Sequence, residues 1–174
     1  MYPNLSNCNL FQSKFEGAYL GAANLSDSEM SYINLIACNL NRSNLSGCTL
    51  FTANMRESIL TRANFNRCDL DRADLSHAIL KYVNLYGASL KSANLSNAIF
   101  QNTKLKYANL FKANLTECDL NECVFLETNV AQVKHGNINH DMLKNIEIYQ
   151  PDKDDNDVIY ITSKFLKEEE KCQK

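Results

Sequence analysis

The chain has 174 residues, with 18 Lys and Arg against 20 Asp and Glu and a formal net charge of −2. This length suits one domain with an appendage, and the absence of net positive charge argues against direct nucleic-acid binding. No apolar run approaches the ~18 residues of a membrane span. The repeat described next begins at the first residues and leaves no room for a signal peptide. We therefore expect a cytoplasmic protein, with secretion as an effector left open.

A five-residue repeat fills residues 1–130. Every residue numbered with a multiple of five, from Leu5 to Val130, is large and apolar: 19 Leu, 4 Phe, 2 Met and 1 Val. The position two residues before each large residue holds Ala, Cys, Ser or Thr in 23 of the 26 copies. Neither a helix nor a flat strand would bury residues spaced five apart on one side. A chain that turns a corner once per unit places both positions inside, so the pattern predicts a solenoid.

The residue before each large one indicates how many units make a coil. One Asn series recurs every 20 residues, and a second series lies ten residues out of phase with it: Asn4, Asn24, Asn44, Asn64 and Asn84, then Asn34, Asn54, Asp74, Asn94 and Asn114. Four units per coil put the two series on opposite faces of a square column of about 6.5 coils, roughly 30 Å long. We expect the amides to hydrogen-bond along the stack. Ile33 and Val83 overfill the small inner position, so local bulging is expected there.

The repeated units carry a resemblance to a known family. Ala23-Asn24-Leu25, Ala63-Asn64-Phe65 and Ala73-Asp74-Leu75 resemble the A-(D/N)-L-x-x signature of pentapeptide-repeat proteins. The resemblance covers about three quarters of the chain and implies an all-β solenoid, a right-handed quadrilateral β-helix. It is a strong indication of fold and a weak one of function.

Six of the seven cysteines fall in the small inner position, where Ala is the usual occupant: Cys8, Cys38, Cys48, Cys68, Cys118 and Cys123. Small buried thiols commonly serve as core residues, and we interpret these as packing. Cys48 and Cys68 are expected to stack on adjacent coils, which leaves a disulfide open but not expected in a reducing cytosol. No paired C-x-x-C motif supports zinc.

Residues 131–174 abandon the repeat, and we predict a small α/β appendage. A helical turn near His140–Ile146, strands at Ile146–Tyr149 and Val158–Thr162, and a helix after Ser163 are expected. Because a solenoid needs its last edge covered, the segment is interpreted as a cap or a dimerisation element. The N-terminal end has no obvious cap, so a homodimer through either end of the solenoid stays open.

No catalytic or metal site is expected, and no cofactor. The loop 152–157 weakly resembles a calcium loop but lacks Gly at its sixth place and an acidic residue at its twelfth. His135 and His140 have no convincing third ligand, and His77 lies beside no obvious nucleophile. A filled column also offers no deep pocket, so we expect a protein that is not an enzyme.

Two groups of outward residues form the candidate partner surface. The first is an apolar row of Ile59, Ile79 and Ile99, extended two coils back by Tyr19. It predicts an interface, with a self-supporting β-branched ladder or cover by the tail as alternatives. The second is a basic belt around the middle of the column: Arg42, Arg62, Arg67 and Arg72, with Arg56 nearby. An acidic collar, Glu117, Asp119, Glu122 and Glu127, lies near the C-terminal end of the column. Partner steering and ordinary solvation are both open for these charges.

We interpret the chain as a non-enzymatic scaffold that binds an unidentified protein partner through side-chain ladders on a rigid β-helix. The alternative follows from the resemblance: some pentapeptide-repeat proteins are similar to duplex DNA and bind DNA gyrase or topoisomerase IV, protecting them from inhibitors or toxins. Thirty ångströms of duplex would present roughly 18 negative charges. Residues 1–130 hold 11 Lys and Arg and 11 Asp and Glu, a net charge of zero (11 − 11), so mimicry ranks second.

Overall fold

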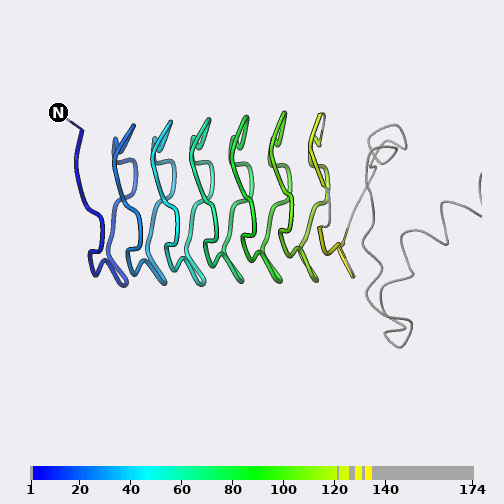
Figure 1. Cartoon of the computed structure of the whole chain (residues 1–174), viewed down its shortest axis with the longest axis horizontal. Helices are drawn as coiled ribbons and strands as arrows, with labels where there is room; N and C mark the ends of the chain where they lie inside the picture. Colours follow the sequence, from blue (N-terminus) through cyan, green and yellow to red (C-terminus); the bar gives the residue numbers. More distant parts are fainter. Residues whose placement is uncertain (1, 121, 126–127, 131, 135–174) are drawn as a thin grey trace, which may run out of the picture.

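The computed structural model describes residues 2–120, 122–125, 128–130 and 132–134. These residues wind into a column of stacked coils with the N-terminus at one end (Figure 1). Among them there is no helix and no extended strand, and isolated parallel β-bridges join the coils instead. Every bridge joins residue i to residue i + 20, from Asn4 with Asn24 to Asn114 with Lys134. Four five-residue units therefore make one coil, and the predicted four-sided solenoid is confirmed.

Each face of the column carries one row of bridge residues. The first face carries Asn4, Asn24, Asn44, Asn64, Asn84, Lys104 and Val124; the second carries Asn9, Glu29, Thr49, Asp69, Ser89, Asn109 and Asn129; the third carries Lys14, Asn34, Asn54, Asp74, Asn94, Asn114 and Lys134; the fourth carries Tyr19, Asn39, Ile59, Ile79, Ile99 and Asp119. The first corner follows the first face, and the second, third and fourth corners follow in chain order.

The repeat works because all five backbone amides of a unit find acceptors, as residues 44–48 illustrate. The N–H of Asn44 donates to Ala23 O of the preceding coil at 2.9 Å. The N–H groups of Leu45 and Gly47 donate to the next coil, to Asn64 O at 2.8 Å and to Asn66 O at 2.9 Å. The other two bonds stay within the unit: Ser46 N–H donates to Asn44 Oδ1 at 3.2 Å, and Cys48 N–H donates to Leu45 O at 3.1 Å. Paired backbone groups are a condition for burying a chain. The Ser46 bond needs a side-chain acceptor two residues back, which is the physical reason for Asn or Asp at the bridge position.

Each corner is a tight turn with a left-handed residue at its second position. The i→i+3 bond, such as Ala53 N–H to Leu50 O at 3.0 Å, closes the turn. Positive φ occurs at the second corner residue of every described corner, from Asn7 at 55° to Gln132 at 54°. A negative φ followed by a positive φ is the signature of a type II turn. Turning once per unit resets the side-chain alternation, so a period of five can keep one side inward.

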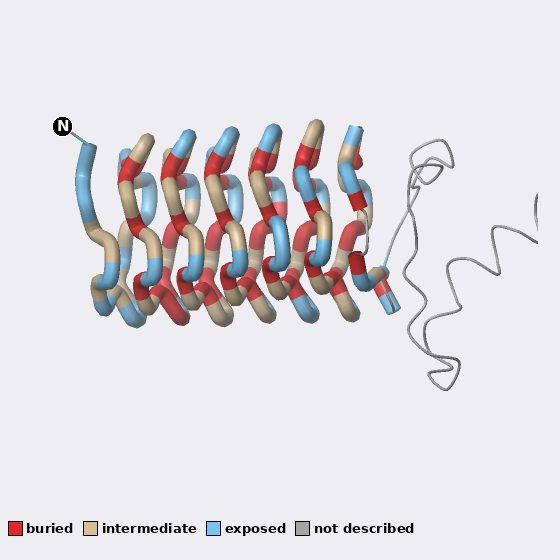
Figure 2. Tube along the Cα trace, viewed as in Figure 1, coloured by how far each residue is buried: buried red, intermediate tan, exposed pale blue. Residues whose placement is uncertain are grey.

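The interior is filled by the two inner positions, which appear as the buried bands along the tube in Figure 2. From Leu20 to Phe125 the large inner side chains are almost fully buried, including Leu45, Met55, Leu70 and Leu80. The small inner position adds Ala and hydrogen-bonded Ser, Thr and Cys; Ser43 Oγ, for example, donates to Leu40 O at 2.7 Å. Small side chains predominate at this position, with Ile33 and Val83 as the buried exceptions.

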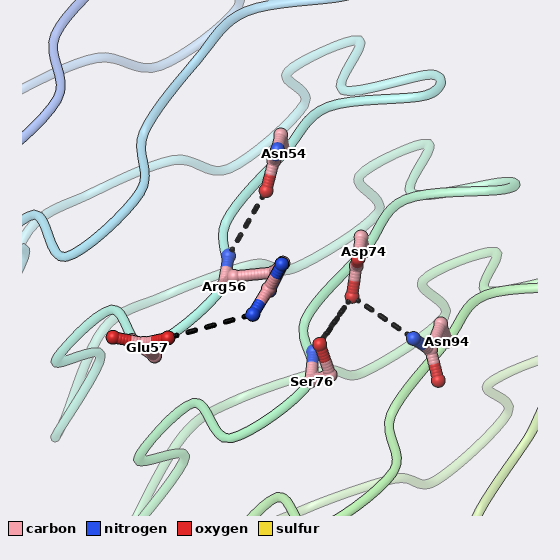
Figure 3. A network of polar contacts seen from close by, with 6 residues as sticks. All are labelled: Asn54, Arg56, Glu57, Asp74, Ser76 and Asn94. Carbon is pink, nitrogen blue, oxygen red and sulfur yellow. Dashed lines mark hydrogen bonds and ion pairs between the residues drawn. The ribbon is translucent and has the colours of Figure 1, made fainter.

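The predicted amide ladder is confirmed on the first face. Each Asn there donates Nδ2–H to Oδ1 of the Asn one coil earlier, at 3.0–3.2 Å from Asn4 to Asn84. On the third face the same ladder joins Asp74, Asn94 and Asn114 at 3.1 Å. Figure 3 shows Asp74 accepting hydrogen bonds from Ser76 and from Asn94. It also shows the Arg56 backbone N–H donating to Asn54 Oδ1.

The bulging predicted at Ile33 and Val83 does not occur. Both side chains are fully buried, and the bridges at Asn34 and Asn84 continue the ladder without interruption. The turn bonds from the two amides are 3.2 and 3.3 Å, within the 2.8–3.3 Å range of the other corners, so the larger side chains fit without opening the turn. Residues 132–134, which the sequence analysis assigned to the appendage, still follow the repeat: Val133 is buried and Lys134 bridges Asn114. The rest of the predicted appendage, including His135, His140 and the loop 152–157, lies outside the described residues, as does Glu127.

Candidate functional site

The isoleucine row, Ile59, Ile79 and Ile99, is continuous along the fourth face. Parallel bridges join Ile59 to Ile79 and Ile79 to Ile99, so their side chains stack on successive coils. Ile59 is 38% exposed, whereas Ile79 and Ile99 are half-buried. Asn39 precedes the row and Asp119 follows it. The fourth face therefore presents an apolar strip three coils long with polar ends.

Tyr19 does not join this strip, although the sequence placed it in the same row. It lies two coils away, and Asn39 stands between it and Ile59. Its ring lies against Gly21, where an added Cβ would meet the Tyr19 ring and hydroxyl at 3.3 Å. The Tyr19 side chain is thus turned toward the fourth corner of the first coil and is 78% exposed.

The isoleucine row gives up hydrogen bonds that the repeat normally makes. At most other bridge positions the side chain accepts from the amide two residues later, as Asp69 Oδ1 does from Asp71 N–H at 3.0 Å. An isoleucine cannot accept, and within the described structure the amides of Thr61, Lys81 and Gln101 have no protein acceptor. Three successive coils therefore replace a bonding residue with an apolar one at partly exposed positions.

The fourth corner borders the isoleucine row and brings two of the predicted arginines to it. Arg42, Arg62 and Tyr82 occupy this corner on successive coils. The Arg62 guanidinium carbon lies 5.6 Å from the centre of the Tyr82 ring, a cation–π distance. Tyrosine and arginine beside an apolar strip form a composition typical of protein interfaces.

The other two belt arginines lie elsewhere. Arg67 is at the first corner, where an added Cβ on Gly87 would lie 3.7 Å from its Cγ. Arg72 is at the second corner with its guanidinium 5.6 Å from the Phe51 ring centre. The four arginines thus lie on three successive corners, with Arg42 and Arg62 on the same corner, which is the arrangement expected for a belt around the column. Arg56, at the third corner, pairs with Glu57 at 3.5 Å (Figure 3).

An aromatic column lies on the second corner, formed by Phe11, Tyr32, Phe51 and Arg72. The sequence places Phe11 and Phe51 on one face but on coils that are not adjacent, and the sequence reasoning missed that Tyr32 joins them. The rings of the column meet edge to face, Phe11 with Tyr32 at 5.7 Å and Tyr32 with Phe51 at 5.8 Å between centroids. Phe11 and Phe51 occupy the first corner position on coils that are not adjacent, and Tyr32 fills the gap from the second corner position. Comparing both corner positions together would have found it.

Acidic residues lie beyond the C-terminal end of the isoleucine row. Asp119 follows Ile99 on the fourth face, and Glu122 accepts a hydrogen bond from Asn102 at the fourth corner. Glu117 is exposed at the third corner. The strip therefore runs from Arg42 and Arg62 at one end to Asp119 and Glu122 at the other.

The thiols in the described coils are free and inward-facing. Cys48 Sγ donates to Leu25 O at 2.9 Å and Cys68 Sγ to Leu45 O at 2.7 Å, which satisfies both in the core. Burial raises the pKa of Cys48 to about 11, and it raises the pKa of Cys68 further. These thiols are protonated at neutral pH and poor nucleophiles. The described residues contain no group of three His, Cys, Asp or Glu that could hold a metal, and no helix that could span a membrane.

Comparison with known proteins gives family matches along most of the column. Residues 4–75 match the family model described as "Pentapeptide repeat region", and residues 68–106 and 107–131 match "Pentapeptide repeats (8 copies)". A search of curated proteins finds no significant match.

Two solved structures show the same fold. The chain is similar to HetL, a pentapeptide repeat protein involved in heterocyst differentiation regulation from the cyanobacterium Nostoc sp. strain PCC 7120, at 26% identity and a TM-score of 0.52, over 76% of this chain and 72% of that one. It is also similar to QnrB1, a plasmid-mediated fluoroquinolone resistance protein, at 17% identity and a TM-score of 0.50, over 77% of each chain. These likenesses support the right-handed quadrilateral β-helix.

Proposed function

The chain belongs to the pentapeptide-repeat family, and we propose that it is a non-enzymatic scaffold that binds a protein partner. Solenoids of stacked repeats bind their partners through their outer surfaces. The contact surface of this proposal is the isoleucine row together with Arg42, Arg62 and Tyr82 of the fourth corner. The column has its interior filled by its own side chains, so recognition has to use outward residues.

The observation that carries the proposal is that the isoleucine row lacks the corner hydrogen bonds that the repeat normally makes. A bridge-position Asn or Asp would satisfy the amides of Thr61, Lys81 and Gln101, each such bond contributing about 0.5–1.5 kcal/mol. Folding alone therefore does not require isoleucine at these sites. Three partly exposed isoleucines in a row are consistent with a requirement outside folding, since activity often opposes stability.

The charges beside the isoleucine row indicate which charges a complementary partner surface would carry. Arg42 and Arg62 lie at one end of the strip, and Asp119 and Glu122 lie at the other. A complementary surface would carry an apolar ridge with acidic groups near Arg62 and basic groups near Asp119. Stacking on Tyr82 restricts the Arg62 side chain, which reduces the entropy cost of binding.

The experiment is affinity capture from the native cell with the full chain and two single-charge variants. Ile79→Asp places a carboxylate in the middle of the strip, and Asp at a bridge position accepts the corner amide, so the coil should fold. Asn109→Asp adds the same charge at the same position on the second face, where Asn109 Oδ1 accepts from Phe111 N–H at 3.0 Å. We expect Ile79→Asp to lose the captured partner and Asn109→Asp to keep it. Equal capture by both variants, with unchanged circular dichroism, would reject the strip as the contact surface.

The DNA-mimic alternative has a direct test. A mimic of duplex DNA needs a densely negative surface, whereas cations lie on three corners of this column as Arg62, Arg67 and Arg72. Gyrase supercoiling measured with and without the purified chain, in the presence and absence of a fluoroquinolone, decides this reading. Protection of gyrase would favour mimicry over the scaffold proposal, and an unchanged reaction would remove it.

A further inference from the structure

The cations in the second half of the column gather on one side of it. Residues 81–116 hold five Lys and no Asp or Glu. Lys104 lies on the first face, Lys106 at the first corner, and Lys91 and Lys112 at the second corner. Two arginines occupy the same two corners on earlier coils. We call this surface, which borders the second face, the cationic side: Arg67, Arg72, Lys91, Lys104, Lys106 and Lys112.

The acidic residues of the same coils lie on the other side. Glu117 is at the third corner, Asp119 on the fourth face and Glu122 at the fourth corner. The cationic side carries only Asp69 and Asp71 among its acids, so its six cations leave a local charge of +4 (6 − 2). The zero net charge of residues 1–130 therefore combines surfaces of opposite sign on opposite sides of the column.

Most of the cations on the cationic side have no acidic partner. Among the described residues, Lys91 pairs with Asp71 at 3.7 Å, and the other five cations of the cationic side make no ion pair. Asp71 is also used within the fold, because it accepts a hydrogen bond from the backbone N–H of Lys91 at 2.9 Å. Cations gathered on one surface repel one another and attract an anionic ligand.

Aromatic rings lie among these cations. Tyr86 and Tyr107 meet edge to face at the first corner, 5.2 Å apart between centroids, and are 39% and 42% exposed. Lys106 Nζ lies 4.7 Å from the centre of the Tyr107 ring. At the second corner Lys112 Nζ lies 4.9 Å from the centre of the Phe111 ring. These cation–π contacts hold ammonium groups beside rings on both corners.

We propose that the cationic side binds single-stranded nucleic acid. Unpaired nucleotides offer phosphates to cations and base faces to aromatic rings, the combination found on surfaces that bind single strands without sequence preference. In a duplex the bases are stacked on one another, so Tyr86 and Tyr107 would have no base face to contact. The total charge of −2 does not prevent this binding, because a strand on the cationic side meets the local charge of +4 and more distant charges are screened.

A single strand fits the cationic side better than a lipid surface or an acidic protein segment does. Insertion into a lipid surface needs apolar side chains that reach past the cations, whereas Phe111 is half-buried beside the Lys112 ammonium. An acidic segment would use the cations and leave the exposed rings of Tyr86 and Tyr107 without a role. The proposed protein partner is a separate matter, because its contact surface lies on the opposite, fourth face.

The test is fluorescence anisotropy of a labelled single-stranded oligothymidylate of ~15 nucleotides with the full chain at several salt concentrations. With about four phosphates neutralised, the logarithm of the binding constant should fall against that of the salt concentration with a slope of about −3. Lys106→Gln with Lys112→Gln should weaken binding roughly tenfold at low salt and reduce the slope by about 1.4. Lys14→Gln with Lys134→Gln removes the same charge from the third face and should change affinity by less than about twofold.

Tyr107→Asn tests the rings separately from the charges. Asn tolerates the left-handed corner at Tyr107, where φ is 61°, so the coil should fold. Losing a stacking surface should weaken binding by about fivefold or more and leave the salt slope unchanged. Tyr32→Asn, at the same turn position with φ of 58°, is the matched control and should bind like the wild type. Melting curves show whether each variant stays folded.

Four results would overturn the proposal. They are no binding of the oligothymidylate at low salt, binding of a duplex of the same length or of a poly-glutamate peptide at least as tight, equal losses from the two lysine pairs, and wild-type affinity in Tyr107→Asn. Binding of poly-glutamate or of anionic lipid vesicles in place of the oligothymidylate would assign the cationic side to an acidic protein or a membrane. None of these results bears on capture through the fourth face, so this proposal and the protein-partner proposal fail separately.

Discussion

At the scale of single residues, the bridge position determines whether a corner amide is satisfied. The side chain of Asn64 takes part in three hydrogen bonds. It donates to Asn44 Oδ1 at 3.1 Å, and it accepts from Asn84 Nδ2 at 3.0 Å and from the backbone N–H of Asn66 at 3.2 Å. Ile79 takes part in none of these, although its backbone pairing is the same. The same backbone therefore holds a structural residue on one face and an apolar one on another.

This difference predicts opposite effects of exchanging the two residue types. Asn64→Ile should lower the free energy of unfolding by about 1–3 kcal/mol, because it removes three bonds of roughly 0.5–1.5 kcal/mol each from partly exposed groups. Ile79→Asn should change it by less than about 0.5 kcal/mol, since the gained amide bond offsets the lost contacts with neighbouring isoleucines. Urea unfolding measures both. A large loss in Ile79→Asn would mean that the isoleucine row is there for stability.

The buried thiols predict a pH dependence of stability. Burial raises the pKa of Cys48 to about 11 from an ordinary value of 9.0, and that of Cys118 to about 12. Between pH 9 and 11 the unfolded chain loses thiol protons that the folded chain keeps, so the free energy of unfolding falls as pH rises. Below pH 9 both states are protonated and this contribution is constant.

The measurement is denaturant unfolding at pH 8 and pH 10.5 for the wild type and for Cys48→Ala with Cys118→Ala. Alanine already occupies the same inner position in many coils, so the variant should fold. Its stability should fall less over this pH interval than that of the wild type. Identical pH dependence in the two proteins would show that the thiols ionise as freely in the column as in the unfolded chain.

At the scale of the five-residue unit, the corner imposes a left-handed residue on almost any side chain. Arg62, His77 and Tyr82 all adopt φ of 59–61° there. Thr52 does so at 58° although it is β-branched, which is unfavourable in this region. The inter-coil hydrogen bonds, such as Thr52 N–H to Asp71 O at 3.0 Å, hold it in place.

Thr52→Asn should therefore raise the free energy of unfolding by about 0.5–1 kcal/mol, because Asn tolerates the left-handed region better than a β-branched residue. Ser92→Asn, at the same corner two coils later with φ of 56°, is the matched control and should gain less. Thermal melting of both variants gives the comparison. A loss of stability in Thr52→Asn would imply that the Thr52 side chain makes a packing contact that outweighs its strain.

The unit scale also explains what could be predicted from the sequence. The inner positions were predictable because a side chain such as Leu45 or Leu70 must be large and apolar wherever the coil closes. The tolerance of Ile33 was not, since the room at an inner position depends on how the surrounding side chains pack, which residue volumes alone do not give. The column of Phe11, Tyr32 and Phe51 was missed because a corner has two outward positions and a long side chain reaches from either. Likewise, the direction of the Tyr19 ring depends on Gly21, not on the repeat.

At the scale of the whole molecule, continuous inter-coil bonding joins the described coils into one body. Each coil is bonded to the next on all four faces in the middle of the column. Leu70→Ala, in a central coil where Leu70 is 1% exposed, should lower the free energy of unfolding by about 2–5 kcal/mol. Because neighbouring coils depend on each other, circular dichroism and tyrosine fluorescence should report the same shifted transition. Two separate transitions would indicate that the ends of the column unfold independently.

The account depends on the fourth face being the side that meets the partner. The most direct measurement is site-specific photo-crosslinking in the native cell, with a photoreactive residue in place of Ile99 or, as the control, in place of Asn109 on the second face of the same column. We predict crosslinked partner from the Ile99 position and none from the Asn109 position. Partner crosslinked equally from both positions, or only from Asn109, would contradict the proposed surface.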